Sequence, residues 1–167
     1  LQSGRVSQGI NSVAIGLRAS ETNQGANSVA IGVDSARNSQ GANGVAIGNA
    51  AGQTNQAASS VAIGVSAGSA TQGASAVAVG DRAGQFTQGI QTVAVGVQAG
   101  QFNQQANSVA IGKSVYGNVD ATCSVSIGNA ICNEGANNVM IGNCIQGNGN
   151  RTCQVLIGYN NYGVDKS

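Results

Sequence analysis

A four-residue motif, Val-Ala-Ile-Gly or a close variant, recurs along the entire chain and limits the possible folds more than any other feature. Its first eight copies begin every sixteen residues without slippage, from Val13 to Val125. Two further copies begin at Val139, after a step of fourteen residues, and at Val155. A near-fixed period of this kind indicates a repeat architecture, in which each unit buries its apolar residues against its neighbours. We therefore expect one structural coil per repeat.

The residues of the motif predict a strand rather than a helix. Its two large apolar residues are separated by a single residue and followed by Gly, and no i, i+3, i+4 stripe is present. The chain contains no proline, which would remove backbone N–H donors from the ladder between coils. Aromatic residues make up only 3% of the chain, so an ordinary globular core is not expected. The sequence predicts an all-β protein, a parallel β-solenoid of about ten coils.

Side chains alternate along a strand, so the Val and Ile of each motif share one face and the central Ala lies on the other. We expect the Val and Ile residues to point inward and form the core. These residues are Val29, Ile31, Val45, Ile47, Val61, Ile63 and their equivalents. The Ala column would then face outward, although Ala has poor β propensity. Either another surface lies close to this column, or crowding between coils excludes larger side chains.

Two other columns have structural explanations. The Gly that ends each motif never varies within the chain, which predicts a corner that needs positive φ or has no room for a Cβ atom. A Gln column runs from Gln8 to Gln104 at intervals of sixteen residues on the return side of the coil. Identical amides in register can stack into ladders, as they do in cross-β assemblies.

The pattern loosens after Gly112. The Gln column is replaced by Asp120, Glu134 and Asn150, and cysteines appear only in the last repeats. We expect a single solenoid domain over residues 1–158, regular to about residue 112 and divergent over 113–158. Residues 159–167 are expected to form a C-terminal cap or a linker to a further domain, in a chain that is part of something longer.

The segments Asn27-Ser28-Val29-Ala30-Ile31-Gly32 and 107–112 resemble the head repeats of trimeric autotransporter adhesins of the YadA type. That family's head is a left-handed parallel β-roll with one repeat per coil, assembled as a trimer and used for surface attachment. Its usual coil is shorter than sixteen residues, and this sequence has no visible coiled-coil stalk, neck or membrane anchor. The Gln-Gly-Ala-Asn segment before the motif also resembles repeats in surface or fibre proteins of large viruses.

The resemblance implies a left-handed coil, a homotrimer and an extracellular location on a cell or virion surface. Combined with the uniformly small column described above, it places the expected contact between protomers on the central Ala of each motif. The trimer-interface residues predicted in this way are Ala14, Ala30, Ala46, Ala62, Ala78, Ala94 and Ala110.

No catalytic, cofactor-binding or metal-binding residues are predicted, and no cofactor. The chain has no His, and among its six acidic residues only Asp120 and Glu134 share a column, so imidazole metal sites lack their parts and no acid/base pair recurs along the rod. The Gly-rich segments carry no Gly-Lys-Ser/Thr sequence of a phosphate loop. Calcium-binding β-rolls need an Asp in every repeat. The net charge of +1 indicates neither nucleic-acid binding nor direct membrane insertion.

The four cysteines are Cys123, Cys132, Cys144 and Cys153. Their spacings do not match the close pairs of common zinc sites. Cys123 and Cys153 share a column two coils apart, which is too far for one bridge, whereas Cys132 and Cys144 could meet only with local distortion. We favour partly buried thiols over a disulfide.

Two classes of function remain open. The first is a non-enzymatic adhesin or fibre domain that mediates attachment to a host receptor, matrix protein or glycan. The second is a structural spacer or virion component that provides length and stiffness. Ice binding is a more distant interpretation, because the Thr residues are split among columns. The residues expected to bind a partner or cap the end are Tyr116, Tyr159 and Tyr162.

Overall fold

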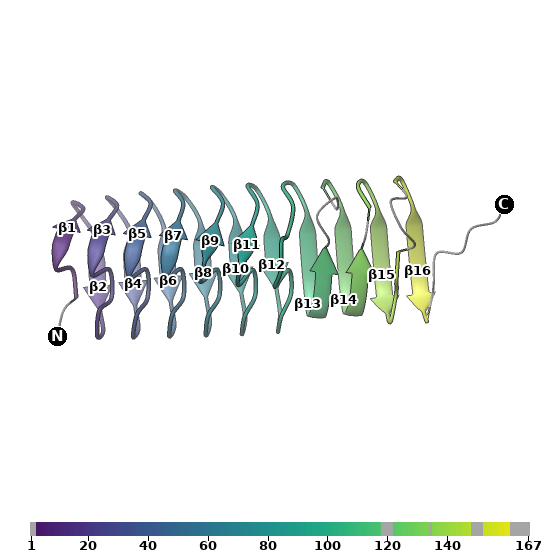
Figure 1. Ribbon diagram of the computed structural model, residues 1–167, viewed down its shortest axis with the longest axis horizontal. Coiled ribbons are helices and arrows are strands. Elements are labelled where there is room, and N and C mark those ends of the chain that lie inside the picture. The colour runs from purple at the N-terminus through teal and green to yellow at the C-terminus, as the bar shows by residue number, and fades with distance from the viewer. Residues whose placement is uncertain (1–2, 118–121, 134, 148–151, 161–167) are drawn as a thin grey trace.

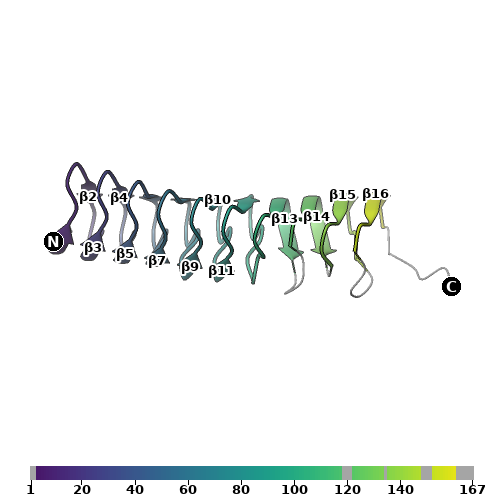
Figure 2. The same ribbon diagram turned by 90° about the horizontal axis from the view of Figure 1, so that it is seen from above.

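The chain forms a rod of stacked parallel coils, as the repeat period predicts (Figure 1). The computed structural model describes residues 3–117, 122–133, 135–147 and 152–160. Successive coils are displaced along one axis, and each of the first six coils contributes one strand to each of two parallel sheets (Figure 2). The predicted fold class, an all-β parallel solenoid with coils of mostly sixteen residues, is confirmed.

The larger sheet has ten strands, one from each copy of the motif. Its strands are β2 (Val13–Ile15), β4 (Val29–Ile31), β6 (Val45–Ile47), β8 (Val61–Ile63), β10 (Val77–Val79), β12 (Val93–Val95), β13 (Val109–Gly117), β14 (Val125–Asn133), β15 (Val139–Asn143) and β16 (Val155–Tyr159). Pairing keeps equivalent residues side by side, so that Ala78 lies opposite Ala94 in the next coil.

The smaller sheet has six strands and lies on the return side of the regular coils. Its strands are β1 (Val6–Gln8), β3 (Thr22–Gln24), β5 (Asn38–Gln40), β7 (Thr54–Gln56), β9 (Thr71–Gln72) and β11 (Thr87–Gln88). Each Gln again pairs with the Gln of the next coil, so the predicted register holds on this side too.

The predicted orientation of the motif is wrong, because the small residues face inward and the large ones outward. Ala62 is fully buried, whereas Ile63 is 37% exposed. The residues that were expected inside, and that lie half-buried or exposed on the outer face, are Val29, Ile31, Val45, Ile47, Val61 and Ile63. The interior between the two sheets is filled by Ala, Ser and Gln side chains in the regular coils. The small Ala side chain fits this narrow space, and strand alternation then places the Val and Ile residues of the motif on the outer face.

The predicted trimer interface on the Ala column is therefore also wrong. Six of these alanines belong to the buried core of their own chain, and Ala14 in the first coil packs against it. Side chains inside a coil cannot contact another protomer. The residues that were predicted at the interface and instead lie in or against the core of their own chain are Ala14, Ala30, Ala46, Ala62, Ala78, Ala94 and Ala110.

The invariant Gly after each motif meets both conditions expected from the sequence. Gly80 has φ of 129°, a value that L side chains rarely adopt. A Cβ atom at this position would approach the carbonyl oxygen of Gly96 in the next coil to 2.5 Å. The corner therefore needs Gly both for its backbone conformation and for the close stacking of successive coils.

The Gln column is buried, and its amides mainly link the two sheets across the coil. Gln72 Nε2 donates to the carbonyl oxygen of Val61, 2.7 Å away, and five other Gln residues make the equivalent bond. The expected amide ladder is present at only two steps, one of which is the bond from Gln24 to Gln40. The Gln residues thus stabilise each coil internally more than they connect one coil to the next.

The divergent coils have longer strands and a more apolar interior. Strands β13 and β14 each extend over nine residues. Val115 and Ile131 take the interior place of the small residue after the motif, and Met140 that of the motif Ala; all three are fully buried. No helix in the described part of the chain is long and apolar enough to cross a bilayer.

Candidate functional site

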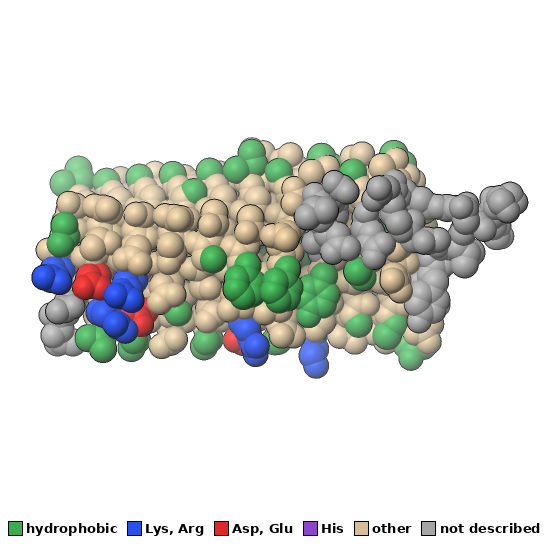
Figure 3. All heavy atoms as spheres, in the orientation of Figure 1, with side chains coloured by type: hydrophobic (Ala, Val, Ile, Leu, Met, Phe, Trp, Pro, Cys, Tyr) green, Lys and Arg blue, Asp and Glu red, His purple; other side chains and the backbone are tan. Residues whose placement is uncertain are grey.

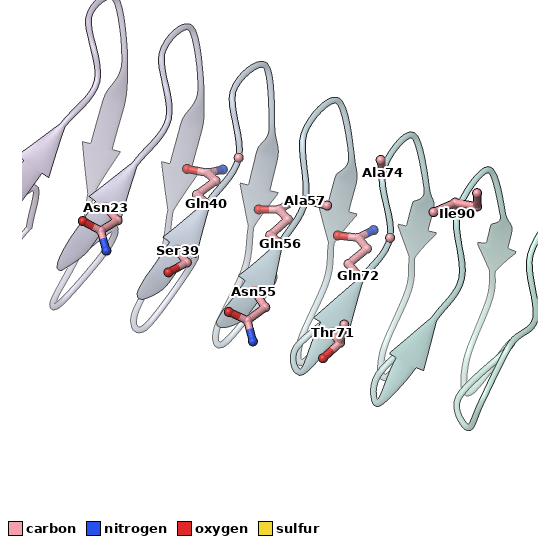
Figure 4. A pocket seen from close by; sticks show the side chains of 12 residues that line it. Asn23, Ser39, Gln40, Asn55, Gln56, Ala57, Thr71, Gln72, Ala74 and Ile90 are labelled. Atoms are coloured by element: carbon pink, nitrogen blue, oxygen red, sulfur yellow. The ribbon is translucent and has the colours of Figure 1, made fainter.

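An open groove of about 710 Å³ runs over the six-stranded sheet (Figure 4). Its lining residues come from five successive coils, from Asn23 at one end to Ile90 at the other. The groove therefore follows the axis of the rod rather than the direction of the strands. None of its lining residues carries a charge.

The floor of the groove is formed by backbone and by very small side chains. Gly41, Ala57 and Gly73 occupy the same position in three successive coils. A Cβ atom on Gly41 would approach the backbone nitrogen of Ala58 to 2.4 Å, so the next coil packs directly against this position. The small side chains at these three positions leave a hollow above them.

One side of the groove carries a row of polar side chains, one from each coil. The row consists of Asn23, Ser39, Asn55 and Thr71. All four residues are exposed, and each precedes the buried Gln of its strand. Three of them have left-handed backbone conformations, with φ between 53° and 60°.

None of these four side chains forms a hydrogen bond with another described residue. Other polar columns are paired: Gln101 Nε2 donates to Gln85 Oε1 at 2.8 Å, and Asn129 Nδ2 donates to Asn143 Oδ1 at 2.8 Å. The amide and hydroxyl groups along the groove are therefore available to a ligand. Sequence reasoning did not identify this row, although the recurrence of Asn, Ser and Thr immediately before Gln is visible in the repeats.

An aromatic stack lies farther along the rod. Phe86 and Phe102 occupy one column with ring centroids 5.0 Å apart, and the Tyr116 ring lies 6.1 Å beyond Phe102. Figure 3 shows a row of large hydrophobic side chains near the middle of the molecule. The rings of Phe86 and Phe102 are stacked, whereas the Tyr116 ring is tilted against that of Phe102. The two Phe residues were not singled out in the sequence, although their spacing of sixteen residues was a signal.

The three tyrosines predicted as a binding or capping set are not brought together. Tyr116 is half-buried in the aromatic stack. Tyr159 ends the last strand and is 70% exposed. Tyr162 lies outside the described residues.

Charged side chains gather over the first coils, where they pair between coils (Figure 3). Arg18 contacts Asp34 at 2.7 Å, and Arg37 contacts Glu21 at 3.0 Å. Opposite charges thus alternate at equivalent positions of neighbouring coils. This arrangement is a structural ladder of ion pairs. It provides no cluster of like charges that could bind an ionic ligand.

No disulfide joins the four cysteines, all of which lie in the described part of the chain. Cys132 and Cys144 are half-buried and line a second hollow of about 300 Å³. Cys123 and Cys153 are exposed, which differs from the partly buried environment expected for them. Within the described ranges, no three His, Cys, Asp or Glu residues come together in a way that could hold a metal ion.

Comparisons with protein-family models, with curated proteins and with solved structures found no match to this chain.

Proposed function

We propose that this chain is a rigid, non-enzymatic fibre domain that assembles side by side with other copies of itself and serves in surface attachment. The single observation that carries this proposal is the apolar outer face of the ten-stranded sheet. The Val and Ile columns on this face continue from the first coil to the last.

The outer face has the composition of a surface that is covered in the functional assembly. No motif carries a charged or polar residue at either outward position. Ile15 and Ile157, near the two ends of the rod, are 58% and 65% exposed, and Ile63 between them is 37% exposed. Apolar patches of this extent mark interaction surfaces in soluble proteins.

The sequence of the strands favours burial on both sides. Strands in sheets that are covered on both faces have nearly continuous apolar sequences, whereas a solvated face alternates with polar residues. Each motif reads Val-Ala-Ile or a close variant, without a polar residue on the outer face. The interior of the coil covers the Ala side, and another copy of the chain would cover the Val and Ile side.

A second copy fits this face because both surfaces repeat with the same spacing. Coils follow one another at about 4.8 Å, so ridges of Val and Ile on one rod match the grooves of another along their whole length. The resemblance to YadA-type heads favours three copies. We therefore propose a homotrimer packed on the Val and Ile columns, located on a cell or virion surface.

Sedimentation-velocity ultracentrifugation tests this assembly. The parent chain is expected to sediment as a trimer, and Ile63→Lys as a folded monomer, because one lysine per chain would place three cations within the interface. Thr87→Lys is the matched control, since Thr87 is exposed on the opposite sheet. A monomeric parent chain at micromolar concentration would contradict the proposal.

The regularity of the coils favours a spacer as the second candidate. Seven successive motif strands keep the same register without an insertion. Beads coated with the trimer distinguish the two functions: attachment predicts binding to cells or to extracellular matrix, and a spacer predicts no binding above that of uncoated beads.

A further inference from the structure

We propose that the groove over the six-stranded sheet binds a neutral, linear glycan chain that lies parallel to the axis of the rod. This proposal rests on the proposed attachment function, because it names the class of ligand to which the chain would attach. It does not depend on how the chains assemble.

The polar side of the groove matches the hydroxyl groups of a sugar chain. Asn23, Ser39, Asn55 and Thr71 offer amide and hydroxyl groups that are exposed and form no hydrogen bond within the described structure. Amides and hydroxyls both donate and accept, as sugar hydroxyls do. Each successive coil presents one such side chain, so a ligand along the axis meets a new partner at every coil.

The floor of the groove matches the apolar C–H surfaces of sugar rings. Ala57, Ala74 and Ile90 contribute apolar side chains, and Gly41 and Gly73 contribute bare backbone. A flat chain with polar edges and apolar faces can therefore rest on the floor while its edge contacts the polar row. A purely apolar ligand would leave the four polar groups without partners.

The absence of charged side chains from the lining makes the expected ligand neutral. An anionic glycan or a nucleic acid would find no Lys or Arg here to neutralise it. The arginines of the first coils do not line the groove, and Arg18 and Arg37 are already paired with carboxylates.

The length of the groove explains why the ligand should be a polymer. The four polar residues lie on successive coils spaced by about 4.8 Å, so the row extends over roughly 14 Å between its first and last members. The groove is open, so a longer chain can continue past its ends. Affinity is therefore expected to rise with chain length until all coils of the groove are contacted.

Calorimetry with defined oligosaccharides tests the proposal. The probes are linear β-1,4-linked hexasaccharides of glucose, mannose and N-acetylglucosamine, together with their disaccharides. At least one hexasaccharide is expected to bind, more tightly than its disaccharide and with little dependence on salt. A heparin-derived hexasaccharide and a neutral Ser/Thr/Val hexapeptide are expected not to bind.

Two pairs of variants localise the binding. Ala74→Phe fills the exposed floor of the groove and is expected to weaken binding at least about tenfold, a difference of about 1.4 kcal/mol. Ala106→Phe changes the same column outside the groove and is expected to leave binding unchanged. Asn55→Ala removes one polar group, and Asn103→Ala is its control, because Asn103 has the same left-handed conformation but does not line the groove.

The outcomes separate this proposal from the proposed assembly. Failure of all neutral hexasaccharides to bind, equal binding by Ala74→Phe, or binding of only the heparin probe or the peptide would each overturn the glycan assignment. The same titrations on the Ile63→Lys variant measure glycan binding to the groove of a monomer. A monomeric parent that still binds a neutral glycan would refute the trimer and leave the groove proposal intact.

Discussion

The regular coils up to residue 112 and the divergent coils after it fill the same narrow interior in two different ways. In the regular coils, Ala and Ser side chains line the interior and a buried Gln spans it to reach the opposite strand. In the divergent coils, Val115, Ile131 and Met140 fill the space with larger apolar side chains. The comparison shows that this solenoid tolerates either a polar link or an apolar core, provided that the volume is filled.

The divergent coils keep one polar network inside. Asn138 Nδ2 donates to Asn133 Oδ1 at 3.1 Å, and Asn133 Nδ2 donates to Ser126 Oγ at 3.3 Å. All three residues are buried. These shorter amides link neighbouring segments of the interior where the sequence no longer supplies the regular Gln.

The outer face does not change between the two regions. Val and Ile keep their outward positions through the last strand, where Val155 and Ile157 are exposed. The interior can therefore diverge while the outer face is retained, as expected if a separate requirement acts on that face.

The largest effect is expected from a methyl group at the invariant corner, which meets the next coil at every copy of the motif except the last, Gly158. Gly80→Ala places Cβ about 2.5 Å from the carbonyl oxygen of Gly96, at a φ of 129°, and should cost more than about 4 kcal/mol of unfolding free energy. Gly158→Ala has a similar φ of 138° but meets nothing within 4 Å. It should cost only the strain of about 1–3 kcal/mol. Chemical denaturation of both variants tests the difference, and equal losses would contradict the stacking argument.

Truncation of a large interior residue in the divergent coils is expected to have the next largest effect. Ile131 is fully buried, so Ile131→Ala should destabilise the chain by about 2–5 kcal/mol through lost burial and a cavity. Val65→Ala in a regular coil is the comparison, since Val65 is 52% exposed and its loss should cost less than about 1 kcal/mol. Thermal unfolding followed by circular dichroism measures both, and a larger loss for Val65→Ala would reverse the assignment of inside and outside.

Replacement of the interior Gln residues is expected to lower the free energy of unfolding by an intermediate amount, which depends on the hydrogen bonds that each Gln makes. Gln40 donates to the Val29 carbonyl and also accepts from Ser20 and Gln24. Gln40→Leu leaves two buried donors without this acceptor and should cost about 2–3 kcal/mol.

Gln72→Leu is the matched variant. Gln72 Oε1 has no hydrogen-bond partner among the described residues, so this substitution also removes an unsatisfied acceptor and should cost about 1 kcal/mol. Urea unfolding of the two variants provides the measurement. Equal costs would show that the Gln–Gln and Ser–Gln contacts contribute nothing.

The ion pairs between the first coils are expected to contribute least to the free energy of unfolding. Arg18 and Asp34 are partly exposed, with 36% and 16% of their side chains accessible. Arg18→Gln should therefore reduce stability by less than about 1 kcal/mol at low salt, and by less at high salt because of screening. Denaturation at two salt concentrations tests this, and a loss that does not change with salt would point to packing instead of charge.

The sequence predicted the solenoid because the period of the motif is a one-dimensional signal that survives without tertiary information. It could not assign the faces of the strand. Alternation requires Val61 and Ile63 to share one face, but only the width of the coil decides which face that is. Ala62 lies inside because the coil interior is narrow. The distance between the two sheets, which sets that width, cannot be derived from the sequence. The groove was missed for a related reason: it results from the close packing at Gly41 and Gly73, which becomes visible only when coils are stacked.

The central claim is that the motif Ala faces inward and its large apolar neighbours face outward, and a pair of substitutions in one strand tests it most directly. Ala78 is fully buried, and Val79 follows it on the outer face. Measured by urea unfolding, Ala78→Leu is predicted to destabilise the chain by more than about 3 kcal/mol because the interior has no room for three more carbon atoms. In the Ile63→Lys background, where the proposed interface is open, Val79→Leu is predicted to change stability by less than about 1 kcal/mol. The opposite result, a tolerated Ala78→Leu and a disruptive Val79→Leu, would contradict the account.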